Sequence, residues 1–491
     1  MKTKFAFLYI TVCFISFLTP SCVDEQFTTD PSAVLSFSCD TLSFDTVFTN
    51  VPSRTVSFFI YNKNDKALKI TSARLAKGSE SYFRFNLDGR IPPSTNFLQN
   101  IEIKAKDSLF VFVELTVDPN DSDFPVFYKD SMVFVTNGQT QDVKLITYGQ
   151  DAIVFNGKSL TENTTLTAVR PYLIFNYLHI VEGKTLTLEP GARLFFHDKA
   201  NLIIDGNLIS DGTLEKPVVM RTDRFDRLPD VDKTPYDYMP GQWGGVYLQN
   251  SKGSHLLNHT FIRGCNLGVV IVGTHAEKPT LTVKNSVLHS MTQYGLYAQN
   301  AKVIVENTEI SNCGTSCLYL LGGESYVVHS TLANYYMWGQ RKSETLVISN
   351  YILDGNLLYL YPVTSSVIEN SIVFGNQSKE ILLHKDTFTN AMYNVLISNT
   401  LIKSKRLDDA EFHNITWARS QNTTAQGVAD TVFVNTSIDK IAETGYYNFQ
   451  LDAKSIARSK ANTAVAGRYP IDLLGKSRLR DGAPDLGAYE K

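Results

Sequence analysis

The sequence predicts an all-β chain in which an antiparallel β-sandwich is followed by a solenoid of parallel strands. A pattern of six residues, aliphatic–any–Asn–Ser/Thr–any–aliphatic, recurs in the second half of the chain, with steps of 27, 22, 22, 21, 20 and 29 residues between its Asn positions. A nearly fixed interval of this length is typical of solenoids, in which each turn buries its inward face against its neighbours. Ahead of the repeats, several segments alternate apolar and polar residues, which is typical of strands with one solvated face.

Residues 1–21 are predicted to be a signal peptide that lies outside the fold. Two lysines precede an apolar run at 5–18, which is too short to cross a bilayer as a helix. A small residue, Ser21, then stands directly before Cys22. This arrangement is similar to the lipobox of bacterial lipoproteins, and the resemblance implies that the Cys22 thiol carries a lipid. An ordinary secretory signal is the alternative.

Residues 22–33 are predicted to be a linker that begins at the lipidated Cys22. Its acidic start, Asp24 and Glu25, resembles the surface-export signal of Bacteroidetes lipoproteins. The resemblance implies attachment to the outer membrane with the body of the protein facing outward. The acyl chains would supply the membrane affinity, because each buried methylene contributes about 0.8 kcal/mol.

Residues 34–150 are predicted to form the sandwich, because turn residues divide the alternating segments at short intervals. The order of these segments looks like the immunoglobulin-like modules of bacterial surface proteins, and that resemblance implies no site. Asp118, Asp121 and Asp123 share one loop, where ordinary turn chemistry is favoured over a Ca²⁺ site. The alternating segments lie at 54–61, 67–74, 108–117, 130–135 and 142–148.

Residues 151–491 are predicted to form the solenoid, with an internal ladder of Asn side chains. The aliphatic residues two before and three after each Asn can both point inward only if the chain bends between them. Asn suits such a bend, since it tolerates a left-handed backbone and bonds to local backbone groups. His329 takes the Asn place in one turn and can donate one hydrogen bond within the ladder. The predicted ladder consists of Asn258, Asn285, Asn307, His329, Asn350, Asn370 and Asn399.

The repeats resemble those of the right-handed parallel β-helix proteins. Short strands cut by Pro190-Gly191 and by two Asp-Gly turns are similar to the opening coils of β-helix surface lipoproteins of Bacteroidetes. The end of the chain, Pro484-Asp-Leu-Gly-Ala-Tyr-Glu490, is similar to the closing motif of many such proteins. The resemblance implies a right-handed parallel β-helix over residues 151–491, and we expect the closing segment to cover the last coil.

The composition and the motifs indicate no catalytic residue, no cofactor and no metal ion. Lys and Arg number 46 against 49 Asp and Glu, so no basic face for nucleic acid is expected. The sequence contains no nucleophile elbow, phosphate-binding loop, HExxH motif or dinucleotide fingerprint. Cys313 and Cys317 lack a second ligand pair at zinc spacing, so buried thiols are expected, with a disulfide as the next alternative.

Any ligand groove is expected beside residues 223–238, which interrupt the coils and mix carboxylates, guanidinium groups and tyrosines. Polysaccharide lyases use Ca²⁺ or an Arg to neutralise a uronate and a base to remove its C5 proton. Glycoside hydrolases need two carboxylates at a fixed separation. The alternative is a solvated loop whose charges pair among themselves, with structural roles for His255, His259 and Arg263. We expect Trp243 to pack under the loop. The groove candidates are Arg224, Asp226, Arg227, Tyr236, Trp243, His255 and Arg263.

The leading functional hypothesis is a non-enzymatic outer-membrane surface lipoprotein that binds glycans or serves display and adhesion. Its expected partners are the membrane, through the lipid, and a polysaccharide; nucleic acid is not expected. The alternatives are a polysaccharide lyase or glycoside hydrolase on the same scaffold and a purely structural spacer, because a fold alone does not fix a function. An aromatic strip without paired acids would favour binding, and clustered carboxylates with Arg and Lys would favour an enzyme.

Overall fold

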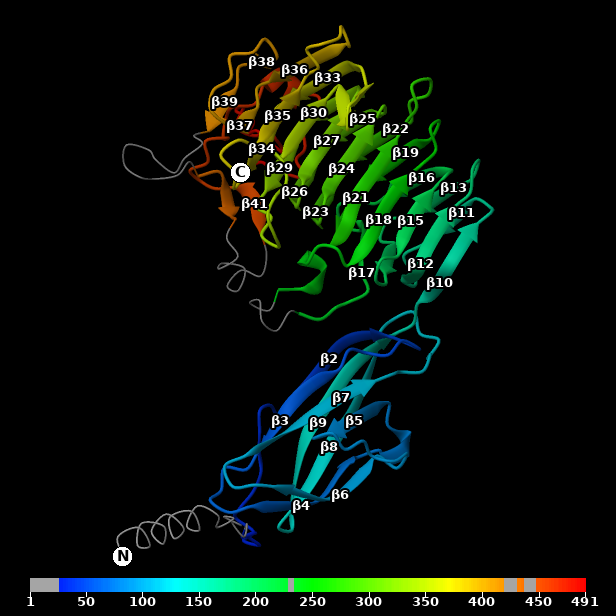
Figure 1. Cartoon of the computed structure of the whole chain (residues 1–491), viewed down its shortest axis with the longest axis vertical. Helices are drawn as coiled ribbons and strands as arrows, with labels where there is room; N and C mark the ends of the chain where they lie inside the picture. The colour runs from blue at the N-terminus through cyan, green and yellow to red at the C-terminus, as the bar shows by residue number, and fades with distance from the viewer. Residues whose placement is uncertain (1–25, 228–233, 419–430, 437–446) are drawn as a thin grey trace, which may run out of the picture. The chain divides into compact units, whose positions relative to one another are not determined.

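The computed structural model describes residues 26–227, 234–418, 431–436 and 447–491. The chain divides into two compact units, one up to Gln150 and one from Asp151 onward (Figure 1). The predicted signal peptide and the lipid site at Cys22 lie outside the described residues. Among the helices of the described part, none is long and apolar enough to cross a membrane.

The first unit is a β-sandwich of two mainly antiparallel sheets, as the alternating segments predict. Side chains such as Phe58, Phe83 and Phe134 fill the space between the sheets and are at most 1% exposed. The first sheet has the order β1 (Ser36–Phe37), β3 (Val56–Tyr61), β7 (Ser108–Leu115), β5 (Phe83–Leu87). The second sheet has the order β2 (Thr41–Phe48), β9 (Gln139–Gln150), β8 (Val126–Thr136), β4 (Leu68–Leu75), β6 (Phe97–Ile103), and a short 3-10 turn, η1 (Gly78–Glu80), follows β4.

Residues 26–33, predicted to be part of a linker, lie against this sandwich. The N–H of Thr28 donates to the carbonyl of Ala67 at 3.0 Å, and Asn137 Nδ2 donates to the carbonyl of Asp30 at 3.0 Å. These backbone groups therefore find partners within the sandwich, as backbone groups generally do. This part of the predicted linker belongs structurally to the first unit.

The second unit is a parallel β-helix in which most coils contribute one strand to each of three faces (Figure 1). Face 1 consists of β11 (Thr164–Leu166), β13 (Thr185–Leu188), β16 (Asn207–Asp211), β19 (Ser254–Asn258), β22 (Thr280–Lys284), β25 (Lys302–Glu306), β28 (Gly323–Val328), β33 (Val363–Glu369), β36 (Tyr393–Ser398) and β38 (Phe412–His413). Face 2 consists of β14 (Arg193–Phe196), β17 (Val218–Thr222), β20 (Thr260–Arg263), β23 (Val287–Met291), β26 (Glu309–Cys313), β29 (Thr331–Asn334), β34 (Ile372–Gly375), β37 (Leu401–Lys403) and β39 (Thr416–Ala418). Face 3 consists of β15 (Asn201–Ile204), β18 (Trp243–Leu248), β21 (Cys265–Val272), β24 (Tyr294–Gln299), β27 (Ser316–Leu321), β30 (Leu346–Ser349) and β35 (Ile381–His384); β10 (Ile153–Leu160) and β12 (Tyr172–Ile180) begin the sheet that faces 2 and 3 share.

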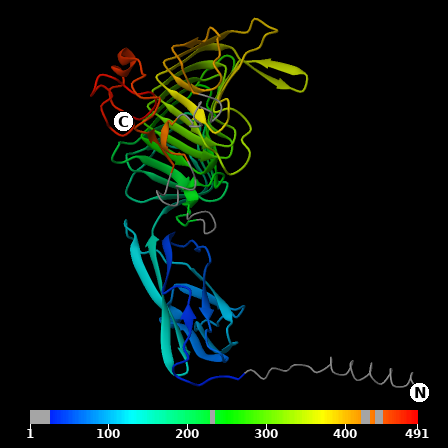
Figure 2. The ribbon, with the colours of Figure 1, turned by 90° about the vertical axis from the view of Figure 1, so that its left-hand side faces the viewer.

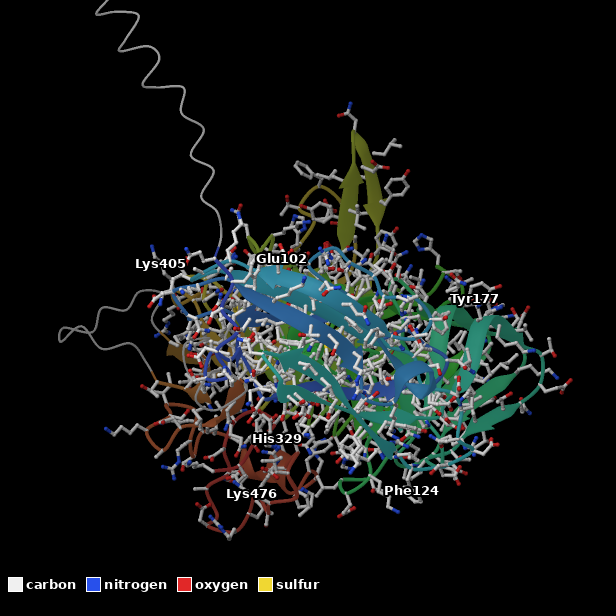
Figure 3. The ribbon with its side chains drawn as sticks, turned by 90° about the horizontal axis from the view of Figure 1, so that it is seen from below. Glu102, Phe124, Tyr177, His329, Lys405 and Lys476 are labelled. Atoms are coloured by element: carbon white, nitrogen blue, oxygen red, sulfur yellow. The ribbon has the colours of Figure 1, made fainter. Side chains whose placement is uncertain are left out.

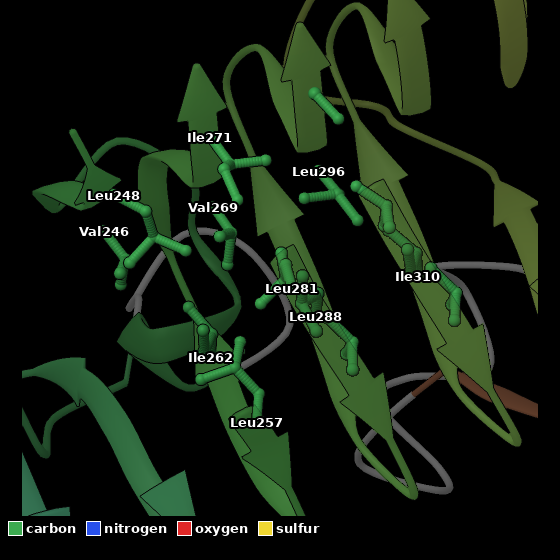
Figure 4. Close-up of a cluster of buried hydrophobic side chains, with 14 of the residues drawn as sticks. Val246, Leu248, Leu257, Ile262, Val269, Ile271, Leu281, Leu288, Leu296 and Ile310 are labelled. Atoms are coloured by element: carbon green, nitrogen blue, oxygen red, sulfur yellow. The ribbon is translucent and has the colours of Figure 1, made fainter. Parts of the chain in front are cut away.

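Stacked aliphatic side chains fill the interior of the coils. On face 3, Val246, Val269 and Leu296 lie in register on successive strands, and all three are 0% exposed (Figure 4). The two aliphatic positions of the repeat, for example Val283 and Leu288, are both buried, because the backbone bends between them. Each fully buried side chain of this kind stabilises the fold by about 1.5–3 kcal/mol.

The bend between faces 1 and 2 carries the repeated Asn residues. Asn307 Nδ2 donates to Asn285 Oδ1 at 2.8 Å, and Asn370 Nδ2 donates to His329 Nε2 at 3.0 Å. These four residues have φ angles between 43° and 50°, the left-handed region that Asn tolerates better than most residues. His329 thus accepts a hydrogen bond within the stack, whereas we expected it to donate one.

Two of the outer ladder positions differ from the prediction. Asn258 lies one residue before the bend, which His259 occupies with a φ of 43°, although Asn258 Oδ1 still accepts from Asn285 Nδ2 at 3.0 Å. Asn399 lies at a bend, with a φ of 42°, but its Oδ1 accepts from Asn414, which the repeat pattern did not include.

Asn350 does not belong to this ladder. Strand β28 pairs directly with β33, so the bend that follows His329 along the stack is Asn370, 41 residues later. Asn350 instead follows β30, at the bend between faces 3 and 1, and precedes a hairpin of β31 (Tyr351–Asp354) and β32 (Leu357–Leu360) that stands out from the coils (Figure 2, Figure 3). The prediction was wrong because this inserted hairpin lengthens one coil to about twice the usual step.

The hydroxyl residue that follows each bend forms a second, fully buried row. The hydroxyls of Ser286, Thr308 and Ser330 each donate to the carbonyl two residues earlier, at 2.7, 2.7 and 2.9 Å. Their side chains are 0% exposed. The N–H of Thr308 also donates to Ser330 Oγ on the next coil at 3.4 Å. An apolar residue here would leave that buried N–H without this acceptor, which explains the Ser/Thr in the repeat.

The C-terminal segment, residues 447–491, lies along face 2 and not over the last described coil. The N–H of Gly487 donates to the carbonyl of Asn370 at 2.8 Å, and the hydroxyl of Tyr489 donates to Glu309, which lies two coils earlier. The expectation that the closing motif covers the last coil was therefore wrong, since its polar groups find their partners along the side of the helix. The segment also contains β41 (Asn448–Leu451), which pairs with β40 (Phe433–Asn435), and the one-turn helix α3 (Thr463–Ala466).

Candidate functional site

The charged loop that interrupts the coils is internally paired. Arg224 donates from Nε to Asp226 Oδ1 at 3.0 Å and from Nη2 to Oδ2 at 2.7 Å, a two-pronged ion pair. The same guanidinium lies 3.4 Å from the centre of the Tyr236 ring. Asp226 is buried, and Arg227 pairs with Pro235 through the backbone. The structure therefore brings these predicted site residues together, but as a closed cluster.

A further carboxylate of this segment, Asp237, is held by two arginines that no sequence motif connects with it. Asp237 lies in the short turn η2 (Tyr236–Tyr238). Its Oδ2 is 3.2 Å from Arg221 Nη1 and 3.5 Å from Arg263 Nη1, and its side chain is 4% exposed. Both arginines belong to face 2, so this pairing fastens the loop over that face, and a buried carboxylate requires such partners. Residues 228–233 of the loop lie outside the described part of the chain.

Trp243 and His255 are buried in different parts of the coil. Trp243 stacks on Phe196 with ring centres 4.1 Å apart and donates its Nε1–H to the carbonyl of Arg263 at 2.8 Å. It is part of the core and not a residue packed under the loop. His255, on face 1, accepts from the N–H of Leu208 at 3.2 Å, and burial lowers its pKa to about 4. Trp243 and His255 therefore do not line a groove together with the loop residues, and the pairing of Arg224 with Asp226 agrees with the self-paired loop given as the alternative.

His289, Ser311 and Glu309 form a hydrogen-bonded series that is closed to solvent. His289 Nδ1 lies 2.7 Å from Ser311 Oγ, and Ser311 Oγ donates to Glu309 Oε1 at 2.6 Å. All three side chains are buried, and burial lowers the pKa of His289. Tyr489 of the C-terminal segment donates to the second oxygen of Glu309. Because the segment covers these atoms, the series attaches the segment to face 2.

The outer side of face 3 carries tyrosines on nearby coils, Tyr247, Tyr294, Tyr297 and Tyr319, which we call the tyrosine face. Tyr297 and Tyr319 lie directly beside each other on adjacent strands, and their rings stack with centres 5.4 Å apart. The ring of Tyr294 meets that of Tyr319 edge-on, also at 5.4 Å. All four side chains are partly exposed. Burial raises the pKa of Tyr297 and of Tyr319, so both hydroxyls stay protonated. The Tyr297 hydroxyl donates to Gln299 Oε1 at 3.0 Å, so towards a ligand its oxygen acts as an acceptor.

The spacing of the tyrosines from the Asn repeat could have predicted this face, although composition and the repeat alone did not. Tyr297 and Tyr319 each follow a ladder residue by 12 positions, Asn285 in one case and Asn307 in the other. Equal offsets within a solenoid place residues in register on neighbouring coils. The hairpin β31–β32 leaves the coils next to this face, with Tyr351 close enough to Tyr319 to affect its ionisation.

Within the described residues, no group of three or more His, Cys, Asp or Glu side chains is arranged to hold a metal ion. Cys265, Cys313 and Cys317 are free and buried. Burial raises the pKa of the Cys265 and Cys317 thiols well above the usual value. They are therefore protonated thiols, which are poor nucleophiles and poor metal ligands.

The family model for the right-handed β-helix region matches residues 134–333 and 268–427, which together make up more than half of the chain. This chain belongs to the right-handed β-helix family. The match includes the repeats, faces 1 to 3 and the tyrosine face. Right-handed β-helices occur in both enzymes and binding proteins, so membership establishes the fold and leaves the chemistry to the site.

Individual relatives of this β-helix protein are distant. It is 28% identical over 128 residues to Protein bark beetle of Drosophila melanogaster. The matched region covers 24% of this chain and only 4% of the length of that protein. A family 123 glycoside hydrolase from Clostridium perfringens matches at 7% identity and a TM-score of 0.18, covering 25% of this chain and 30% of the other. A PapD-like domain of human CEP192 matches at 9% identity and a TM-score of 0.18, covering 27% of this chain and 97% of the other.

Proposed function

We propose that the protein is a Bacteroidetes outer-membrane surface lipoprotein that binds polysaccharide along the tyrosine face and does not cleave it. The tyrosine face carries this proposal. Flat aromatic rings offer apolar surface to the C–H faces of sugar rings, while the phenol hydroxyls provide hydrogen bonds at the edge. The stacked pair Tyr297 and Tyr319 repeats this surface on successive coils, which suits a ligand that is itself a chain. The first unit, similar in its segment order to immunoglobulin-like modules, would act as a spacer from the membrane.

The pairing of the acidic groups supports a role without catalysis. A lyase needs a free base beside a cation that neutralises a uronate, and a glycosidase needs two carboxylates that can reach one bond. Asp226 is occupied by Arg224, and Asp237 by Arg221 and Arg263. Arg224 and Asp226 neutralise one another within the loop, whereas Asp237 is neutralised by two arginines of face 2.

Gel electrophoresis in the presence of xylan, mixed-linkage β-glucan or polygalacturonate tests the binding. We expect one of these polysaccharides to retard the protein, and Tyr297→Ala or Tyr319→Ala to weaken that retardation about tenfold, equivalent to about 1.4 kcal/mol. Tyr177→Ala is the matched control, because Tyr177 is a partly exposed tyrosine on the early strand β12 (Figure 3). Equal retardation of all variants would reject the tyrosine face. Release of reducing ends or unsaturated uronates would reject the non-enzymatic part.

Attachment to the membrane has a separate test, since it depends on Cys22. Cys22→Ala should move the protein from the detergent phase to the aqueous phase in detergent-phase partitioning of whole cells. Surface protease treatment of intact cells then reports whether the body faces outward. Unchanged partitioning of Cys22→Ala would contradict the lipoprotein assignment, while leaving the binding experiment unaffected.

A further inference from the structure

The first unit carries an exposed row of aromatic rings on the outer side of its first sheet. We call Tyr61, Phe59, Phe110 and Phe112 the aromatic row. Phe59 and Phe110 lie directly opposite each other on β3 and β7, with ring centres 4.2 Å apart. Tyr61 stacks on Phe59 at 5.7 Å and 11°, and Phe112 stacks on Phe110 at 5.9 Å and 5°. Phe110 and Phe112 are 44% and 42% exposed.

This arrangement is unusual for the solvated side of a sheet. Antiparallel sheets usually place polar residues on the side that faces water, and each phenylalanine kept there loses the stabilisation that burial would give. Ser57 and Ser108, on the same two strands, occupy outward positions beside the row and follow the usual pattern. A contiguous row of large rings therefore indicates a ligand that covers them.

The row is elongated and diagonal. Tyr61 pairs with Ser108, and Phe112 pairs with Ser57, so the two end rings lie on different strands and four residues apart along them. At a rise of about 3.4 Å per residue, that offset corresponds to about 14 Å. A ligand that contacts all four rings must be extended over a similar length.

A hollow of about 370 Å³ lies at the Phe112 end of the row. Arg84, Asn86 and Glu114 contribute to its lining. Arg84 Nε is 3.2 Å from Glu114 Oε1, and both side chains are about half exposed. Asn86 Oδ1 is buried and accepts no hydrogen bond from any described residue. A buried acceptor without a donor is unfavourable, so a ligand hydroxyl that donates to it would be bound preferentially.

A second hollow, of about 440 Å³, lies at the Tyr61 end. Its lining includes Asn62, Lys106 and Ser108. Lys106 Nζ lies 2.8 Å from Asp65 Oδ1, and Lys63 and Asp107 also line this hollow. Cations and carboxylates are therefore balanced in number here, as Arg84 and Glu114 are at the other end. The row thus joins two hollows that offer hydrogen-bonding groups, and the volumes of both fall within the range of about 300–1,000 Å³ that small-molecule sites occupy.

The chemistry of the row favours a neutral polysaccharide over a protein. An extended glycan has flat C–H faces repeated along its length and hydroxyls at its edges, which match stacked rings that end in polar hollows. The neutralised ion pairs at both ends, Arg84 with Glu114 and Lys106 with Asp65, favour an uncharged chain over a uronate polymer.

We propose that the aromatic row and its two end hollows form a polysaccharide-binding site in the first unit, specific for an extended neutral glycan. This site is separate from the tyrosine face, because the two lie in different units of the chain. The protein then holds a polysaccharide at two places, and the first unit is a binding module and not only a spacer. Two linked sites raise the overall affinity for a polymer that reaches both.

The experiment uses the full-length protein in the Tyr319→Ala background, in which the tyrosine face is weakened. The probes are the neutral polysaccharides mixed-linkage β-glucan, glucomannan and xylan, with polygalacturonate as the charged comparison, in affinity gel electrophoresis. We expect a neutral polysaccharide to retard this background protein, Phe110→Ala to weaken the retardation about tenfold, equivalent to about 1.4 kcal/mol, and Asn86→Ala to weaken it measurably. Phe127→Ala is the matched control, because Phe127 is 48% exposed on β8, in the other sheet.

The following outcomes would overturn the proposal. The first is retardation that Phe110→Ala and Phe112→Ala leave unchanged, or no retardation by any neutral probe. The second is an equal loss in Phe127→Ala, which would indicate a general effect of removing a surface ring. The third is a dimer in sedimentation that dissociates on Phe110→Ala, which would assign the row to a second copy of this chain. Loss of binding only with Tyr319→Ala would reject the aromatic row and leave the tyrosine face standing.

Discussion

Replacing Asn307 by Leu measures how strongly the stacked bend residues stabilise the β-helix. Asn307 Nδ2 donates to Asn285 Oδ1 at 2.8 Å, and Asn307 Oδ1 accepts from Arg478 Nη2 at 2.6 Å, where Arg478 is 0% exposed. Leucine removes both bonds and leaves the buried Arg478 guanidinium and the partly buried Asn285 amide without them, at about 1–3 kcal/mol each. The φ of 48° adds about 1–2 kcal/mol for a residue other than Gly or Asn. We therefore expect the free energy of unfolding to fall by about 3–8 kcal/mol.

Urea unfolding, followed by circular dichroism and by tryptophan fluorescence, measures this loss. Two probes are needed because a solenoid can unfold in parts, which would separate the two transitions. Asn307→Gly is the matched control, since Gly adopts the left-handed backbone without strain but has no side-chain amide that could donate or accept a hydrogen bond. The Gly variant therefore reports the hydrogen bonds, and the difference between the Leu and Gly variants reports the backbone strain.

A loss below about 1 kcal/mol for Asn307→Leu would refute this reasoning, because it is less than the cost of one unpaired buried polar group. The pair with Arg478 gives a second check. In a double-mutant cycle with Arg478→Leu, the two losses should be strongly non-additive, since both variants remove the same hydrogen bond. Simple additivity would show that the contact between Asn307 and Arg478 contributes nothing.

Other buried polar groups give equally direct predictions. Arg341→Met should lower the free energy of unfolding by about 3–5 kcal/mol, because it removes the guanidinium that lies 2.6 Å from the fully buried Glu380 carboxylate. In the same urea assay, the double variant with Glu380→Leu should recover part of the lost stability. Burial lowers the pKa of His255 from 6.5 to about 4, so the unfolded chain binds the extra proton first, and stability should fall by about 3 kcal/mol between pH 6.5 and pH 4. His255→Gln should show a smaller decrease in urea midpoint over that pH range. Gly487→Ala should make the C-terminal segment more sensitive to proteolysis, because the φ of Gly487 is 88° and an added Cβ would lie 2.6 Å from Thr331 Oγ1 on face 2. Gly482→Ala is the control for backbone strain alone, since the φ of Gly482 is 72° and the space around its Cβ is open.

The fold was predictable where one coil repeats the next. The inward positions of Val283 and Leu288 follow from the repeat, because each coil packs only against its neighbours and the same pattern must recur. The error at Asn350 has the same origin. An inserted hairpin places an Asn 21 residues after His329 (350 − 329), a normal coil step, and spacing alone does not distinguish an extra coil from an insertion.

The candidate site was less predictable because its contacts join residues that are far apart in the chain. The pairing of Arg224 with Asp226 is local, and the sequence already offered a self-paired loop as one interpretation. The ion pair between Arg263 and Asp237 depends on which coil the loop folds over, and no local sequence pattern indicates that coil. Trp243 was expected under the loop, yet its ring fits between coils against Phe196, a packing contact that only the register of the strands determines.

The side chain at position 329 explains one of the contacts that hold the C-terminal segment. In the regular stack each amide donates to the residue one coil earlier, so His329 would have to donate to Asn307, but its Nε2 accepts from Asn370 at 3.0 Å. Asn307 Oδ1 therefore needs another donor, and Arg478 of the segment provides it at 2.6 Å. On the other side, Asn370 Oδ1 accepts from the N–H of Asn462 at 2.8 Å. The segment thus supplies donors to Asn307 Oδ1 and Asn370 Oδ1, in addition to the hydrogen bond from Tyr489 to Glu309. Asn307→Leu should for this reason loosen the segment as well as weaken the stack.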